Sequence, residues 1–173
     1  EGYESVAWPS LPDEPARIEA ALRDAAESFD LVITCGGVSA GEKDFLPELL
    51  AREGRVHFWK VRMRPGMPVL AAHWDRARFL CLPGNPVSVL ATFLAFGRRM
   101  LDGLQGRREP RAKRHARLSA PIRKKHERLE FLRGRRADAF DRAVPFPIRI
   151  GVDTNSDGLA RAHIRELRLL RIG

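Results

Sequence analysis

A glycine-rich loop has the residue types that could bind a phosphate-bearing ligand together with a metal ion. In "DLVITCGGVSAGEKD" an apolar run leads into Gly36, Gly37 and Gly41, and glycines let the backbone approach a ligand closely. Ser39 adds a hydroxyl and Asp44 a carboxylate, and Mg²⁺ favours one or two carboxylates with substrate phosphates. The spacing is neither a Walker A nor a GxGxxG pattern. Asp44 could equally cap the following helix, and both interpretations stay open.

A second corner, "LCLPGNPVSVL", places Pro83, Gly84, Asn85, Pro86 and Ser88 between two apolar runs. Gly84 permits a tight backbone path, Asn85 is a good N-cap, and Pro86 suits the first helical position. Ser88 then falls on the first turn, where unpaired amides and the helix dipole favour an anion. Plain helix capping explains the same residues, and both hypotheses stay open. The anion site needs further support before it is favoured over capping.

A basic segment, "KVRMRPGMP", contains Lys60, Arg62 and Arg64 before a Pro-Gly turn. If the strand alternation continues, the three cations share one face and can point toward one pocket. Solvated surface charge is the alternative. The five histidines lack metal-ligand spacing, and no Ser-His-Asp or Cys-His arrangement is evident. Cys35 and Cys81 also lack metal spacing, which predicts core thiols in a reducing, cytoplasmic compartment.

Hydrophobic periodicity predicts the elements that position these loops. Asp13 is expected to cap a helix over 13–29, whose apolar stripe is formed by Ile18, Leu22 and Ala25. Alternating strands and helices indicate an α/β fold with a mostly parallel sheet. The expected strands are 30–34, 55–61, 69–74 and 79–82, and the expected helices 45–53 and 86–101, the last apolar on most faces and hence buried. Loops 35–44 and 83–86 then open on the edge where ligands bind in open α/β sheets.

The second half of the chain differs from the first half in two ways: it lacks the long helical patterns, and it is more basic. The 173 residues carry 31 Lys and Arg against 22 Asp and Glu, for a net charge of +9. We expect an α/β domain over 1–105 and a small all-β domain over 110–173. No run is long enough to span a membrane. Nucleic acid binding is not favoured, because the basic stretch 107–136 has Phe131 as its one aromatic residue for stacking.

Together, "DLVITCGGVSAGEKDF", "HFWKVRMRPGMP", "CLPGNPVSVLATF" and "RLEFLRG" resemble the molybdopterin molybdenumtransferase family, the MoeA and gephyrin E-domain group, in its C-terminal part. The resemblance implies a three-layer MogA-like α/β/α domain followed by a small β-barrel-like domain, with an elongated N-terminal region and the first strand and helix lying outside this chain. It also implies molybdenum cofactor biosynthesis: molybdate is inserted into adenylylated molybdopterin, with Mg²⁺, and AMP is released. A homodimer completes the site in this family, and molybdopterin adenylyltransferase is a further candidate partner.

The resemblance carries roles to individual positions. It implies catalytic roles for Asp13, Asp44, Lys60 and Arg64, with Asp44 near Mg²⁺. The positions implied to bind substrate are Gly36, Gly37, Ser39, Gly41, Pro83, Gly84, Asn85, Pro86, Ser88, Arg128 and Ser156. Molybdate is a small tetrahedral dianion, which cations, a serine hydroxyl and helix-start amides suit.

Three departures from the family pattern concern these positions. Arg64 replaces a usual lysine, Met67 stands where a lysine is common, and Cys35 replaces a usual serine. Ser156 corresponds to a C-terminal serine, after which the tail diverges. Two alternatives stay open: a non-catalytic molybdopterin-binding or scaffold module, and molybdopterin adenylyltransferase, whose loop usually reads Gly-Gly-Thr-Gly where this chain has Gly-Gly-Val-Ser.

Overall fold

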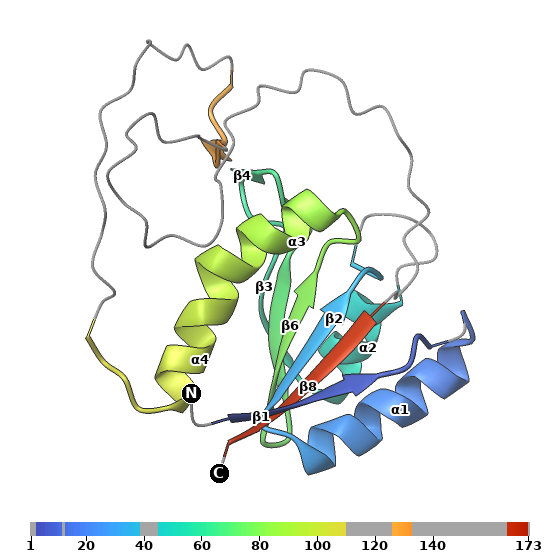
Figure 1. The fold of residues 1–173 in the computed structure, drawn as a ribbon. Helices are drawn as coiled ribbons and strands as arrows, with labels where there is room; N and C mark the ends of the chain where they lie inside the picture. The colour runs from blue at the N-terminus through green and yellow to red at the C-terminus, as the bar shows by residue number, and fades with distance from the viewer. Residues whose placement is uncertain (1–2, 12, 39–44, 110–125, 133–165, 173) are drawn as a thin grey trace.

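The fold was analysed in a computed structural model, which describes residues 3–11, 13–38, 45–109 and 126–132 and the backbone of 166–172. Figure 1 shows a central twisted sheet with helices on both sides. The strands of this sheet are β1 (Tyr3–Trp8), β2 (Leu31–Cys35), β3 (Arg55–Trp59), β5 (Leu70–Trp74), β6 (Ala77–Leu82) and β8 (Glu166–Ile172). The other elements are α1 (Pro15–Ser28), α2 (Leu46–Glu53), β4 (Met63–Arg64), α3 (Pro86–Thr92), the π-helix η1 (Phe93–Gly97), α4 (Arg98–Leu104) and β7 (Leu129–Glu130). Every helix in the described ranges is too short or too polar to cross a membrane.

The α/β class is confirmed, but the sheet is mixed rather than mostly parallel. Its order is β1-β8-β2-β6-β5-β3, and within this sheet only β2 and β6 pair in parallel. Antiparallel pairing of β5 with β6 follows from their short connection at Asp75 and Arg76, because a parallel pair needs a long crossover. The sequence analysis did not anticipate β1, which pairs with a strand distant in the chain.

Strand β8 comes from the C-terminal part of the chain and is part of the main sheet. It belongs to the stretch 110–173 assigned to a separate β domain, yet it lies between β1 and β2 and pairs antiparallel with both. Both neighbours have backbone N–H and C=O groups that need partners, and β8 supplies them. A two-stranded sheet of β4 and β7 lies apart from the main sheet. Apart from 126–132 and β8, the stretch 110–173 is outside the described residues, and the division at 105–110 stays a prediction.

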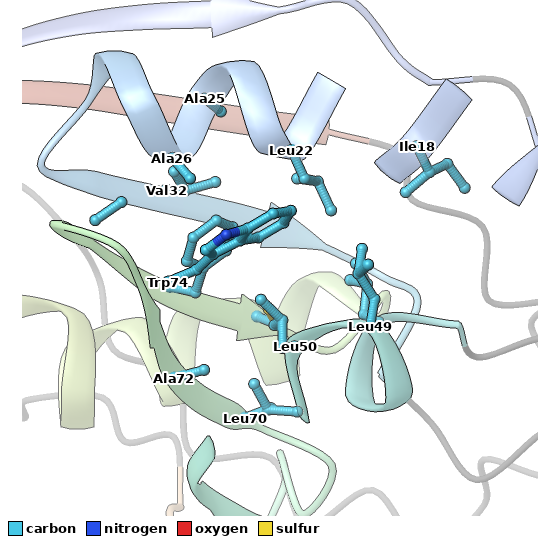
Figure 2. Packing of buried hydrophobic residues seen from close by; sticks show 14 of the residues in the cluster. Ile18, Leu22, Ala25, Ala26, Val32, Leu49, Leu50, Leu70, Ala72 and Trp74 are labelled. Carbon is cyan, nitrogen blue, oxygen red and sulfur yellow. The ribbon is translucent and has the colours of Figure 1, made fainter. Parts of the chain in front are cut away.

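Two apolar clusters hold the layers together. Helices α1 and α2 cover one face, where Leu22 and Leu50 pack with Trp74 (Figure 2). Leu80 and Leu101 belong to the cluster on the opposite face, under α3 and α4. The predicted stripe Ile18, Leu22 and Ala25 is buried, as expected. Each fully buried large apolar side chain stabilises the fold by about 1.5–3 kcal/mol, so these clusters set the relative positions of the strands.

The predicted buried helix over 86–101 is interrupted and partly exposed. Five residues, Phe93–Gly97, form a π-helix between α3 and α4. A Cβ at Gly97 would lie 2.4 Å from Cδ2 of Phe93, so the phenyl ring packs directly on the glycine backbone. Leu90 and Leu94 are 57% and 46% exposed, which contradicts burial on most faces. The sequence could not show which side the neighbouring sheet would cover.

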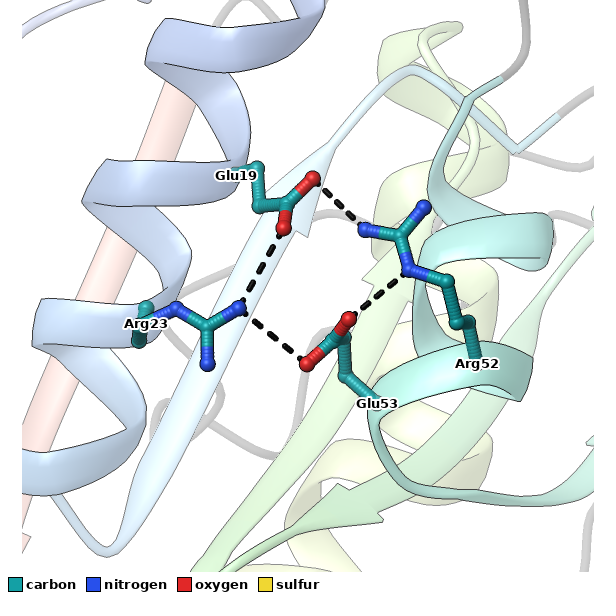
Figure 3. Close-up of polar contacts among 4 residues, drawn as sticks. All are labelled: Glu19, Arg23, Arg52 and Glu53. Carbon is teal, nitrogen blue, oxygen red and sulfur yellow. Dashed lines mark hydrogen bonds and ion pairs between the residues drawn. The ribbon is translucent and has the colours of Figure 1, made fainter.

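Four charged side chains form a ring between α1 and α2 (Figure 3). Arg23 contacts Glu19 at 3.2 Å and Glu53 at 3.1 Å, while Arg52 contacts Glu19 at 2.6 Å and Glu53 at 2.7 Å. Hydrogen bonds from Arg52 and then Arg23 outweigh desolvation and lower the pKa of Glu53 below its ordinary value of 4.5. The ring therefore joins the two helices most effectively while Glu53 is ionised.

We expect the contribution of Glu53 to stability to be present at neutral pH and lost as the pH falls below 4.5 and through the lowered pKa. The urea midpoint of Glu53→Gln should lie below that of the unsubstituted protein at pH 7, and the two should converge in acid. High salt should shrink the difference at pH 7, because exposed ion pairs are screened. Glu27→Gln, an exposed change on the same helix α1, is the control. A gap between Glu53→Gln and the unsubstituted protein that is the same at pH 3 and pH 7 would contradict the expectation.

Candidate functional site

Four strands of the main sheet end at the same edge. β2 and β6 are parallel, and β3 runs in their direction because it is antiparallel to β5, which is antiparallel to β6. β1 also runs this way, because β8 is antiparallel to both β1 and β2. The strand ends Trp8, Cys35, Trp59 and Leu82 therefore lie along one edge. This confirms that the loops after β2 and β6 open side by side.

The described part of the glycine loop is closely attached to this edge. Gly36 and Gly37 have φ angles of 103° and 72°, a region that favours glycine. The Gly36 N–H donates to the Leu82 carbonyl at 2.8 Å, and Val38 is buried. Ser39, Gly41 and Asp44 lie outside the described residues, so their roles stay predictions.

The Pro-Gly-Asn-Pro corner lies against the glycine loop. A Cβ built at Gly84 would be 3.8 Å from the Gly36 Cα. Asn85 is the N-cap of α3, as predicted: its Oδ1 accepts from the Val87 and Ser88 amides at 2.9 and 3.4 Å. Those two amides are thus engaged by the cap, which supports the capping interpretation for them. The Pro86 ring begins α3, as expected.

Lys60 stands where β3 ends. Its φ of 62° takes the chain out of the strand, and its N–H donates to the Val69 carbonyl at 3.2 Å. The expectation that Lys60, Arg62 and Arg64 share one strand face is therefore wrong, because strand alternation ends at Trp59. The Lys60 ammonium lies 4.1 Å from the centre of the Trp59 ring, whose Nε1–H donates to the Val38 carbonyl at 3.1 Å. A cation is thus held beside the glycine loop.

The small sheet places the backbone of the stretch that contains Arg128 beside that of Arg62 and Arg64. β4 and β7 are parallel, the Leu129 N–H donates to the Arg62 carbonyl at 2.9 Å, and the Phe131 N–H donates to the Arg64 carbonyl at 2.7 Å. Both arginine side chains are exposed. Arg62 forms an exposed ion pair with Glu127 at 3.1 Å. The basic segment thus pairs with the stretch that contains Arg128, while Ser156 lies outside the described residues.

Asp13 follows β1 at the same edge, where its side chain is exposed. The sequence predicted Asp13 as the N-cap of α1, and this prediction is wrong. Glu14 holds that position, without a side-chain capping bond. In the described ranges no three His, Cys, Asp or Glu side chains gather as a metal-ligand set. A single carboxylate at the edge still fits Mg²⁺, which takes one or two carboxylates and fills its coordination with phosphate oxygens and water.

The sequence analysis missed Trp59 and interpreted the cysteines correctly in part. Trp59 directly precedes Lys60 in "HFWK", but spacing gave no sign that its indole would reach the loop after β2.

Burial raises the pKa of Cys81 to about 12, as for an inert core thiol. Cys35 is half-buried at the end of β2, next to the glycine pair. It thus lies closer to the candidate site than a core thiol would.

The chain is similar to several known proteins. A family model described as a probable molybdopterin binding domain matches residues 1–103. The chain is 41% identical over 126 residues to molybdopterin molybdenumtransferase of Haemophilus influenzae, covering 72% of this chain and 31% of that protein. It is 33% identical over 102 residues to gephyrin of Dictyostelium discoideum, covering 50% of this chain and 14% of that protein.

Among solved structures, the molybdopterin biosynthesis MoeA protein from Pyrococcus horikosii aligns with a TM-score of 0.49 at 24% identity, over 56% of this chain and 24% of that one. The chain spans less than a third of the length of the Haemophilus relative. The resemblance inferred from the motifs is confirmed, and the chain belongs to the probable molybdopterin binding domain family.

Proposed function

We propose that this chain binds molybdopterin at the strand-end edge and takes part in molybdenum cofactor biosynthesis, in the step that inserts molybdate into adenylylated molybdopterin and releases AMP. The observation that carries the proposal is the close approach of two loops and a cation: Gly36 against Gly84, and Lys60 beside Val38 through Trp59. A pterin phosphate and molybdate are both anions, which a fixed ammonium and close backbone favour.

Each side chain at the edge has a proposed task. Lys60 pairs with a substrate oxyanion, and Arg64 and Arg128 supply further positive charge from the β4–β7 sheet. Ser39 and Ser88 donate hydroxyl hydrogen bonds, while Gly36 and Gly84 leave room for the ligand. Asp44, with Asp13, would hold Mg²⁺, which when bound polarises the phosphoanhydride that is cleaved as AMP leaves.

Other parts of the proposal rest on the family resemblance of the motifs rather than on the described geometry. We propose a homodimer in which a second copy completes the site, and a cytoplasmic location, where the adenylylated substrate would come from an adenylyltransferase. A second candidate function is a non-catalytic molybdopterin-binding module, which is favoured by one observation: Met67 stands where a lysine is common in the family.

The test is turnover of adenylylated molybdopterin with molybdate and Mg²⁺ by the full chain, with AMP release followed by chromatography. We expect AMP release that stops in Asp44→Ala, while the unfolding midpoint changes little. Asp75→Ala, in the β5–β6 turn at the far end of the sheet, is the matched control. Molybdopterin binding without AMP release would favour the binding module, and absence of both would refute the proposal.

A further inference from the structure

We propose that Trp59 is a positioning residue that connects the glycine loop to Lys60, so that molybdopterin meets both in one arrangement; this inference rests on the proposed function. Trp59 ends strand β3, which is one of the two edge strands of the main sheet in the described part of the chain. Its two sides do different things: its Nε1–H donates to the Val38 carbonyl at 3.1 Å, and its ring face carries the Lys60 ammonium at 4.1 Å. No other contact among those described links Lys60 to this loop.

The hydrogen bond to Val38 anchors the loop far from its origin. The loop leaves the sheet at β2, and β3 is three strands away in the order β2-β6-β5-β3. Neighbouring strands are about 4.8 Å apart, so the gap is roughly 14 Å. Three residues, Gly36–Val38, span at most about 10 Å even when fully extended, and a long side chain reaching back from β3 covers the rest. With the Gly36 bond to Leu82, the described part of the loop is held at both ends.

The same residue restricts Lys60. The backbone of Lys60 has a φ of 62°, which non-glycine residues adopt rarely, and the Val69 carbonyl fixes its N–H. That conformation turns the chain so that the lysine side chain folds over its own neighbour's ring. A lysine ammonium on an indole face is attracted by the ring quadrupole. The contact therefore gives the exposed cation a preferred place beside the loop.

A purely structural role fits Trp59 less well. Its side chain is 39% exposed, whereas the core tryptophan Trp74 is 3% exposed. A phenylalanine or leucine would cover the same apolar neighbours at an exposed strand end, but neither could donate a hydrogen bond to Val38. The indole N–H is thus the feature that the position uses.

The test separates the two contacts of Trp59. Trp59→Phe keeps a ring face for Lys60 and removes the donor, while Trp59→Leu removes both. We expect the dissociation constant for molybdopterin, measured anaerobically by calorimetry on the full chain, to rise about threefold to tenfold in Trp59→Phe and further in Trp59→Leu. In addition, Lys60→Met should weaken binding much less in the Trp59→Leu background than alone, because the lysine is no longer positioned.

A measurement without ligand distinguishes failure of the inference from failure of the proposed function. Amide hydrogen exchange at Gly36–Val38 should accelerate in Trp59→Phe, and should not do so in Trp8→Phe, the same replacement at the end of β1. If the unsubstituted chain binds no molybdopterin, the proposed function fails, and exchange alone decides on Trp59. Unchanged exchange at Gly36–Val38, or a Lys60→Met effect on binding that is equal in both backgrounds, would overturn the inference.

Discussion

Phe79→Ala is expected to destabilise the fold by about 3–5 kcal/mol, the range for removing a fully buried aromatic side chain. Phe79 is fully buried in the middle of β6, in the cluster under α1 and α2, and its ring stacks on Trp74 with centroids 6.1 Å apart. Folded domains are stable by about 5–15 kcal/mol in total, so this one change removes a large share. Urea unfolding followed by far-UV circular dichroism measures the loss.

Phe131→Ala is the matched control, because this ring is 39% exposed and exposed substitutions change stability by about 0.5 kcal/mol or less. Phe79→Leu should fall between the two. We also expect Phe79→Ala to disturb the candidate site, because β6 ends at the corner beside the glycine loop. Equal urea midpoints for Phe79→Ala and Phe131→Ala would show that this cluster does not hold the sheet as described.

Lys60→Met is expected to weaken molybdopterin binding about 10- to 100-fold, the cost of a lost charge-assisted hydrogen bond. Methionine keeps the length of the apolar part of the side chain and removes the ammonium, together with its contact with the Trp59 ring. Because the lost interaction is ionic, the affinity of the unsubstituted chain should fall with added salt more steeply than that of the variant. Calorimetric titration at several NaCl concentrations measures both quantities.

Two further variants decide whether position matters as well as charge. Arg78→Ala removes a cation at the start of β6, on the opposite edge of the sheet, and should leave affinity nearly unchanged. Lys60→Arg keeps the charge with a different donor geometry and should bind with intermediate affinity. If Arg78→Ala weakens binding as much as Lys60→Met does, net charge rather than the site is responsible.

The local elements near the site were predictable from sequence because their signals are local. The apolar stripe of α1 at Ile18, Leu22 and Ala25 reports one face of a helix, and it is buried as expected. Asn85 before Pro86 is a start signal contained in two residues, and the cap forms as predicted. Asp13 was predicted to be the N-cap of α1, but the N-cap is the next residue, Glu14. Such signals locate the end of a helix only to within one or two residues.

The sheet was less predictable because strand pairing depends on distant partners. An isolated pattern in β8 could not indicate that it would insert between β1 and β2, more than 130 residues earlier in the chain. The exposure of the Leu90 and Leu94 side chains likewise depends on which side of the helix the sheet covers. Register and neighbour choice follow from long-range packing, which single-segment periodicity does not encode.

The sequence alone determined the family, the α/β class and the chemistry of the loops, because glycines, prolines, an asparagine and cations at short spacing have local conformational and charge preferences. Only the tertiary structure decided how closely the two predicted neighbouring loops approach, at Gly36 and Gly84, and that the end of β3 lies at the same edge. It also decided that Trp59 would connect Lys60 to Val38, since a hydrogen bond between residues 21 positions apart exists only after the strands between them have paired.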